Sequence, residues 1–391
     1  MLRVLYFVHD LADPAVRRRV MMLEAGGAAV TLAGFRRTPG IPAELERLRP
    51  IDLGRTADGK FAQRLKAVAA AAMALGSKLR QVGRPDVIIS RNLEMLALAV
   101  RARSLFSADI PIVYECLDIH RLMLGDNGIS RSMRGAERAL GRKASLLLTS
   151  SPAFVRDYFR RFDQMDAPVA LLLNKVLEMA EQPSSFDAHA GHPDEGEPWV
   201  IGWFGALRCR KSLELLAEFT RRMEGRFEIV LRGRPAYSEF SGFDGFVTAE
   251  PFMRFEGPYR NPEDLSRIYG AVHFAWAIDF FEEGLNSDWL LPNRLFEGCR
   301  YGAVPIAMRR TETGRFLSGR HMGLLLDEAS PHTLAECLGP IDRDAYARMR
   351  GRILAEDSST WVCDLRDCRA LVARLAALGP ERAGDAILQA A

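Results

Sequence analysis

Two segments in the second half of the chain place charged side chains beside a predicted helix start. In the first, Pro292 and Asn293 can open a helix, with Arg294 at its start and Glu297 one turn further on. The N–H groups and dipole of a helix start attract an anion, and a carboxylate can accept hydrogen bonds from two ribose hydroxyls. The segment therefore favours binding of a diphosphate and a ribose. The alternative is an ordinary amphipathic helix with an exposed Arg and Glu.

The second segment follows a predicted strand that ends at Gly205. The loop carries Arg208, Arg210 and Lys211, and a helix begins at Ser212, so backbone donors and positive charges could converge on phosphate. The spacing G-x-x-x-x-G-K-[ST] is absent, which excludes a P-loop, and a solvated basic loop is the alternative. Because both segments fall in one predicted domain, each supports the phosphate-binding interpretation of the other.

Metal-binding patterns are weak. Asp342 and Asp344 form a D-x-D triplet, but it starts a helix instead of following a strand, and His189 and His192 lack carboxylates at ligand spacing. The six cysteines include no C-x-x-C pair, which is typical of a reducing cytoplasm and gives no zinc signature. We therefore expect no catalytic metal and no other cofactor.

The elements that would position these residues alternate between strand and helix in both halves of the chain. Such alternation predicts an α/β fold of two Rossmann-like, doubly wound domains that face a central cleft, with ligands at the carboxyl ends of the strands. The strands are predicted at 4–8, 29–34, 86–90, 111–114 and 146–149, then at 199–204, 227–231, 253–255, 272–277 and 304–308.

Domain boundaries follow from composition. Residues 1–180 form the predicted N-terminal domain, and the Pro-, Gly-, Ser- and acid-rich segment 181–198 is the predicted linker. Residues 199–360 form the predicted C-terminal domain, and 361–391 a helical tail that packs back toward the N-terminal domain. A chain of 391 residues with 48% apolar and 26% charged residues suits such a globular, two-domain protein.

The net charge of +3 conceals two oppositely charged halves. Residues 1–180 hold 28 Lys/Arg against 18 Asp/Glu, whereas residues 181–391 hold 25 against 32. The basic excess gathers in two predicted helices, 61–84 and 129–143, which favours contact with an anionic membrane surface; a solvated helix face is the alternative. No segment reaches the roughly 20 apolar residues of a spanning helix, and the apolar start is too short for a signal peptide.

The layout of the whole chain and its two basic segments resemble the GT-B glycosyltransferases, specifically the group-1, family 4-like enzymes of exopolysaccharide and capsule biosynthesis. Gly205 to Lys211 matches the Gly-x5-Lys loop of that family, and Leu291 to Gly298 is similar to its LPNKLFEY-type stretch. The opening VLYFVHDLADPAVRRRVMMLEAGG resembles the start of succinoglycan-type enzymes. The resemblance implies a nucleotide-sugar donor, expected to be UDP-linked, held by Gly205, Arg208, Lys211, Asn293, Arg294 and Glu297.

Three positions depart from the family pattern. The E-x7-E spacing is missing because Trp289 stands eight residues before Glu297, with Asp288 and Glu283 nearby. Ala206 replaces the arginine that often follows the loop glycine, so Arg208 is the expected substitute. The loop 9–14 lacks the glycines usual in retaining members, and both the retaining and the inverting course therefore stay open.

Transfer of a sugar to an alcohol needs a base near the acceptor hydroxyl and stabilisation of the departing diphosphate. Asp118, just after a strand, is the predicted base, with His120 as the alternative base or a sugar contact. Helix capping or interdomain contact is the alternative interpretation of both residues. The predicted acceptor-binding residues follow neighbouring strand ends: His9, Asp10, Arg91 and Asn92.

These features together predict an enzyme whose domains close on a nucleotide-sugar and pass its sugar to a lipid-diphosphate-linked oligosaccharide. Such an acceptor implies a cytoplasmic protein that lies at the inner face of the inner membrane and docks through the basic helices of its N-terminal domain. A nucleotide-sugar epimerase of the same architecture is the alternative enzyme. A nucleic-acid-binding protein is disfavoured because the basic half contains no recognition module and no aromatic-interleaved basic strand.

Overall fold

The computed structural model describes residues 1–38, 40–57, 61–179, 191–194 and 196–379. The chain forms two compact units, one of Met1–Leu172 with the segment from Asp364, the other of Leu173–Cys363. The second unit starts before the predicted boundary at 180 because β8 (Val176–Leu177) pairs in parallel with β15 (Val362–Cys363). Residues 180–190 of the predicted linker lie outside the described residues.

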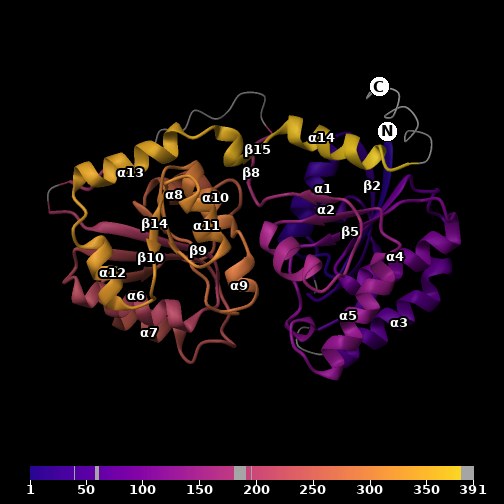
Figure 1. Cartoon of the computed structure of the whole chain (residues 1–391), viewed down its shortest axis with the longest axis horizontal. Helices are drawn as coiled ribbons and strands as arrows, with labels where there is room; N and C mark the ends of the chain where they lie inside the picture. Colours follow the sequence, from indigo (N-terminus) through magenta and orange to yellow (C-terminus); the bar gives the residue numbers. More distant parts are fainter. Residues whose placement is uncertain (39, 58–60, 180–190, 195, 380–391) are drawn as a thin grey trace. The chain divides into compact units, whose positions relative to one another are not determined.

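The first unit contains a seven-stranded parallel sheet in the order β3-β2-β1-β4-β5-β6-β7. Its strands are β1 (Leu2–Val8), β2 (Ala28–Arg36), β3 (Ile51–Arg55), β4 (Val87–Arg91), β5 (Ile112–Cys116), β6 (Leu146–Thr149) and β7 (Val169–Leu171). Its helices are α1 (Pro14–Ala25), α2 (Ala43–Glu46), α3 (Phe61–Lys78), α4 (Leu93–Phe106), η1 (Arg121–Met123), α5 (Gly128–Gly141), η2 (Phe154–Arg160) and α14 (Leu365–Ala376). Helices α3, α4 and α5 pack together on one side of the sheet, with α1 and α14 on the other (Figure 1).

The second unit contains a six-stranded parallel sheet in the order β11-β10-β9-β12-β13-β14. Its strands are β9 (Trp199–Leu207), β10 (Phe227–Pro235), β11 (Met253–Phe255), β12 (Phe274–Trp276), β13 (Val304–Met308) and β14 (Leu324–Leu326). Its helices are α6 (Arg210–Arg222), α7 (Phe243–Ala249), α8 (Leu265–Gly270), α9 (Asn286–Trp289), α10 (Asn293–Arg300), α11 (Glu312–Ser318), α12 (Pro331–Leu338), α13 (Arg343–Ala355) and η3 (Ser358–Thr360). Both sheets confirm the predicted α/β class with two doubly wound, Rossmann-like folds.

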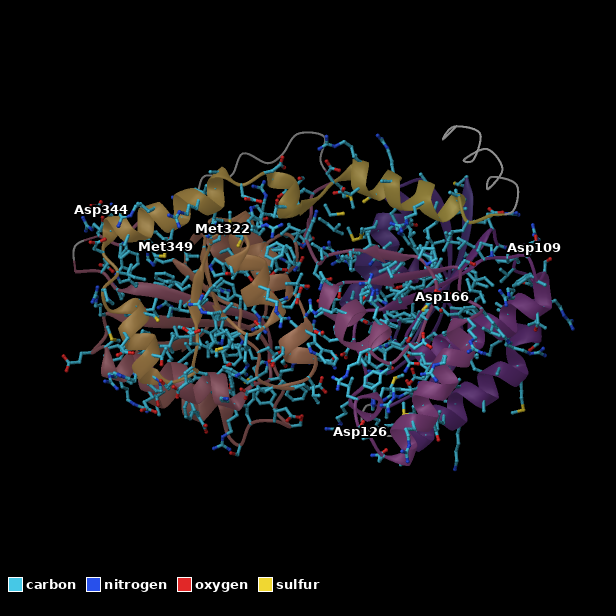
Figure 2. The ribbon with its side chains drawn as sticks, viewed as in Figure 1. Asp109, Asp126, Asp166, Met322, Asp344 and Met349 are labelled. Carbon is cyan, nitrogen blue, oxygen red and sulfur yellow. The ribbon has the colours of Figure 1, made fainter. Side chains whose placement is uncertain are left out.

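The sheets are buried on both faces, as parallel sheets covered by helices require. Strand β4 and strand β13 are fully buried along their length, and the second core gathers large side chains such as Trp203 and Trp276. Figure 2 shows Met322 among the packed elements of the second unit, whereas Asp109 and Asp344 lie at the surface. Within the described ranges, no helix is both long and apolar enough to cross a membrane.

Helix α14 of the C-terminal segment packs on α1, both in the first unit. The contact requires a glycine at position 26, because a Cβ there would lie 2.3 Å from the carbonyl oxygen of Cys368. Asp364 and Asp367 close a capping box at the start of α14, and Arg374 donates a hydrogen bond to the Val169 carbonyl at 3.0 Å. The described part of the predicted tail is thus anchored on the first unit.

Candidate active site

The strand order of the second unit reverses between β9 and β12, and ligands of doubly wound sheets bind at the carboxyl ends of strands at such a point. Gly205, near the end of β9, adopts φ +107°, which favours glycine. It pairs with Gly233 of β10, where a Cβ would lie 1.8 Å from the Gly205 carbonyl oxygen. The two glycines therefore let the carboxyl-terminal ends of β9 and β10 approach closely. No side chain projects from these two positions.

Asp279 brings two predicted donor-binding arginines together at this edge. Arg208 donates to Asp279 Oδ2 at 3.0 Å, and Arg294 Nη2 lies 3.9 Å from the same oxygen. Burial raises the pKa of Asp279, but the positive charges of Arg294 and Arg208 lower it by a larger amount. The pKa of Asp279 therefore lies below its ordinary value. Arg294 Nη1 is buried and has no hydrogen-bond partner within the described residues. Sequence reasoning missed Asp279, although a carboxylate just after a strand was the signal that pointed to Asp118.

Lys211 belongs to a second set of charges at the same edge. Its Nζ donates to Glu283 Oε2 at 2.6 Å and lies 4.4 Å from the centre of the Phe280 ring. Glu283 also accepts from Arg310 at 2.7 Å; burial raises its pKa, the two cations lower it, and the net shift is downward. Arg208, in the loop after β9, and Lys211, in the first turn of α6, are therefore both paired with carboxylates of the loop after β12.

Glu297 is buried in α10 and held at both oxygens. Asn261 Nδ2 donates to Oε1 at 2.8 Å, and the Tyr269 hydroxyl donates to Oε2 at 2.9 Å. The helix starts as predicted, with exposed Asn293 as its first residue and no side-chain cap. Sequence reasoning did not find Asn261 or Tyr269, because no local pattern links them to a helix some thirty residues away.

In the first unit the strand order reverses between β1 and β4, and the predicted acceptor-binding residues follow these two strands. His9 lies 3.6 Å from Asp13 through its Nε2, and burial lowers the pKa of His9 to about 4, so the ring is neutral at pH 7. Asp10 accepts from the backbone N–H of Ala12 at 3.1 Å. Asn92 adopts φ +71° where α4 begins. The structure thus brings His9, Asp10 and Asn92 to one edge of the sheet.

Arg91, in contrast, lies beneath this edge with its side chain only 2% exposed. It donates to Glu115 Oε2 at 2.9 Å, to Asp13 Oδ2 at 3.3 Å and to the Ala15 carbonyl at 3.0 Å. Arg19 and Tyr6 bind the same Glu115, whose pKa falls to about 2 because the two arginines outweigh the effect of burial. This corrects the expected role of Arg91 in acceptor binding. Its donors bind groups of the protein itself, and its buried side chain stabilises the loop after β1.

Asp118 and His120 lie in the loop after β5, with Asp118 exposed. His120 caps η1, where its Nδ1 accepts from the backbone N–H of Leu122 at 3.3 Å, so a neutral ring carries its proton on Nε2. Arg134 of α5 donates to the Met123 and Gly125 carbonyls, both at 2.6 Å, and anchors this loop to the helix. Capping, which the sequence left open for His120, is therefore one of its roles.

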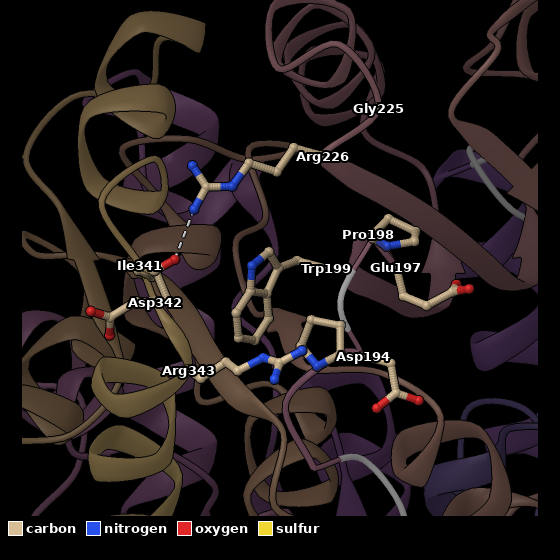
Figure 3. Close-up of a pocket in the computed structure, with 11 residues that line it drawn as sticks. Asp194, Glu197, Pro198, Trp199, Gly225, Arg226, Ile341, Asp342 and Arg343 are labelled. Carbon is tan, nitrogen blue, oxygen red and sulfur yellow. Dashed lines mark hydrogen bonds between the residues drawn. The ribbon is translucent and has the colours of Figure 1, made fainter.

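A surface pocket of about 600 Å³ lies at the opposite, amino-terminal ends of β9 and β10 (Figure 3). Trp199, Asp342 and Arg226 line it, and Arg226 donates to the Ile341 carbonyl at 2.8 Å. Asp342, the first residue of the D-x-D triplet, caps α13 through the Ala345 N–H at 2.7 Å. In the part of the chain that the structure describes, no cluster of His, Cys, Asp and Glu side chains could hold a metal. The pocket lies at the wrong strand ends for a doubly wound sheet to bind its ligand.

Solved structures with this fold cover nearly the whole chain. Sucrose-phosphate synthase from Thermosynechococcus elongatus aligns with a TM-score of 0.68 at 15% identity, over 96% of this chain and 98% of its own. HepE from Anabaena, solved with UDP-glucose, aligns with a TM-score of 0.67 at 14% identity, over 96% and 99%. WaaG, a glycosyltransferase involved in lipopolysaccharide biosynthesis, aligns with a TM-score of 0.55 at 14% identity, over 98% and 99%. The chain therefore has the GT-B fold that these glycosyltransferases share.

A curated relative defines the family more closely. The succinoglycan biosynthesis protein ExoL of Rhizobium meliloti (strain 1021) is 61% identical over 381 residues, which cover 97% of this chain and 94% of the relative. The chain belongs to the family of this succinoglycan biosynthesis protein, and the resemblance seen in the sequence is confirmed. No family model matches the chain.

Proposed function

We propose that this protein transfers a sugar from a UDP-sugar to a lipid-diphosphate-linked oligosaccharide during assembly of an exopolysaccharide. The observation that carries the proposal is the convergence of Arg208 and Arg294 on Asp279 after β12, with Glu297 one turn beyond Arg294 in α10. HepE was solved with UDP-glucose, which supports a UDP-sugar as the donor. The relative is named as a succinoglycan biosynthesis protein, which supports a role in exopolysaccharide assembly. The donor requires no metal in this proposal, because side chains and a helix start neutralise its diphosphate.

The donor diphosphate binds Arg208, Lys211, Arg294 and the start of α10 at Asn293, beside Gly205. These groups stabilise the negative charge that grows on the diphosphate as it departs, which is the main electrostatic requirement of the reaction. Glu297 accepts hydrogen bonds from the ribose. Asn261 donates to one of its oxygens and Tyr269 to the other, and these two hydrogen bonds orient the carboxylate.

Asp118 takes the proton of the acceptor hydroxyl, whose oxygen then forms a bond to the anomeric carbon of the donor sugar. The bond between that carbon and the phosphate oxygen breaks, and UDP leaves with the electron pair. The exposure of Asp118 in a loop anchored to α5 supports this role, because a base must reach the acceptor. His9, Asp10 and Asn92 line the acceptor site at the neighbouring strand ends.

The lipid-linked acceptor places the protein at the cytoplasmic face of the inner membrane, with α3 and α5 against the lipid. Met73 and Leu65, both on α3, are large apolar side chains that are 82% and 48% exposed. Lys66, Lys78 and Arg80 lie on or just after the same helix, and α3 contains no acidic residue. A basic helix with exposed apolar residues is typical of an interfacial membrane contact.

Calorimetric titration with UDP, GDP and ADP tests the donor site. We expect UDP to bind, and Glu297→Gln to weaken its binding roughly tenfold, because the lost charge weakens hydrogen bonds from the ribose. Glu336→Gln, at an exposed position of α12, is the matched control and should bind UDP as the unmodified protein does. Equal UDP affinity in Glu297→Gln and the unmodified protein would remove Glu297 from the donor site.

A further inference from the structure

A tyrosine from the loop between β11 and α8 reaches the donor site. The backbone of this loop is fixed by the sheet, since the Glu256 N–H donates to the Leu231 carbonyl and the Gly233 N–H donates to the Gly257 carbonyl, both at 2.9 Å. The ring of Tyr259 packs on Phe204 with the ring centres 6.4 Å apart. These contacts hold Tyr259 in place without any ligand.

The hydroxyl of Tyr259 lies over the end of β9. A Cβ built on Gly205 would lie 3.9 Å from the hydroxyl oxygen, the nearest atom to that position. The hydroxyl therefore faces the side of Gly205 from which a side chain would project in any other residue. Gly205 is also where the proposed diphosphate approaches the backbone, so the hydroxyl and the ligand share one space.

The charges around Tyr259 are those of the proposed site. Burial and the nearby Glu297 raise the pKa of Tyr259, and Arg294 opposes them, so the phenol keeps its proton at neutral pH and can donate it. Within the described residues the hydroxyl has no hydrogen-bond partner, whereas the hydroxyl of Tyr269 is bound to Glu297. A half-buried donor without a protein partner favours an acceptor atom on a ligand.

We propose that Tyr259 is a further donor-binding residue, whose hydroxyl donates a hydrogen bond to a phosphate oxygen of the nucleoside diphosphate above Gly205. The inference rests on the proposed function, because it assumes that this edge of the sheet holds the donor. Phosphate is the expected acceptor because Arg294, the other neighbour of the hydroxyl, has a buried Nη1 without a partner within the described residues. One phosphate then accepts hydrogen bonds from both the Tyr259 hydroxyl and Arg294 Nη1.

Tyr259→Phe tests the assignment by removing only the hydroxyl. We expect its affinity for UDP, measured by calorimetry, to fall roughly tenfold, because a hydrogen bond to a charged group is lost. Its affinity for uridine, measured by NMR titration, should stay unchanged because uridine has no phosphate. Tyr237→Phe is the matched control, since Tyr237 is exposed and contacts Asp244 outside this site.

Two results would overturn the assignment while leaving the donor site in place. One is equal UDP affinity in Tyr259→Phe and the unmodified protein, and the other is an equal loss of affinity for UDP and uridine. Failure of the unmodified protein to bind UDP would instead overturn the proposed function, and the assignment with it. An unchanged melting temperature of Tyr259→Phe would show that any loss of affinity comes from the missing hydroxyl.

Discussion

Both units contain a buried carboxylate that bridges two arginines near the carboxyl end of a central strand. Glu115 bridges Arg91 and Arg19, which are both almost fully buried. This cluster therefore lies in the interior of the first unit. Asp279 bridges Arg208, which is 40% exposed, and Arg294, which is 11% exposed. The arginines of the second unit are the more exposed pair, which suits their proposed role in binding phosphate.

In the proposed mechanism, transfer depends on Asp118 of the first unit. We expect Asp118→Asn to lower the turnover number by roughly 100-fold or more, because an amide cannot take the proton of the acceptor hydroxyl. Its affinity for UDP should stay unchanged, since the donor residues lie in the other unit. Steady-state kinetics together with calorimetry would measure both quantities.

Asp126→Asn is the control for this substitution, because Asp126 is exposed between η1 and α5 and has no assigned role. It should keep full turnover. Near-normal turnover of Asp118→Asn would rule out Asp118 as the base and leave His120, the alternative that the sequence offered.

The sequence could predict site residues where a local pattern carries them. The loop from Gly205 to Lys211 and the helix start from Asn293 to Glu297 each lie in one continuous segment. Asn261, Tyr269 and Asp279 escaped prediction, because they reach the site from the loop before α8, from α8 itself and from the loop after β12, and only the fold brings these segments together. The expected role of Arg91 failed for a related reason: a strand end predicts the edge of the sheet but not whether a side chain points above or below it.

Among the elements, the central strands of both large sheets were predictable, whereas most of the edge strands were not. The predicted ranges 4–8 and 304–308 agree with β1 and β13, because these strands are continuous apolar runs. Of the strands that the structure describes, five escaped prediction: β3, β7 and β14 at sheet edges, and β8 and β15 in the small sheet. Strands of two to five residues at an edge bury too little surface to leave a pattern in the sequence.

Helix α3 is the element that should bind the membrane. We expect the protein to sediment with vesicles that contain phosphatidylglycerol, and less so at high salt, because the cations of α3 contact anionic headgroups. Met73→Asp should reduce the bound fraction severalfold, since it places a charge in the exposed apolar surface. Sedimentation with vesicles of phosphatidylglycerol and of phosphatidylcholine alone would measure these fractions.

Leu354→Asp is the matched control, because Leu354 is also an exposed apolar residue but belongs to α13 of the second unit. Its bound fraction should equal that of the unmodified protein. If Met73→Asp sedimented as well as Leu354→Asp, α3 would be an ordinary solvated helix, as the sequence also allowed.

The whole chain crosses between its units twice, after Leu172 and again at Asp364. Composition suggested a first boundary near 180, because the polar segment 181–198 stands out in the sequence. The pairing of β8 with β15 draws the preceding residues into the second unit, and a pair of two-residue strands leaves no compositional trace. In the proposed function, the basic first half carries the acceptor and membrane contacts, and the acidic second half binds an anionic donor through a few local cations.

Sugar transfer from a UDP-sugar can be measured by following labelled sugar from a panel of UDP-hexoses into the lipid fraction of exopolysaccharide-producing cells. We predict that the unmodified protein moves label into lipid and releases one UDP per sugar, and that Arg294→Ala slows this roughly 100-fold because it removes a stabilising charge from the departing diphosphate. Absence of labelled lipid with every UDP-hexose, or conversion of a UDP-hexose into an isomer without acceptor, would contradict the account.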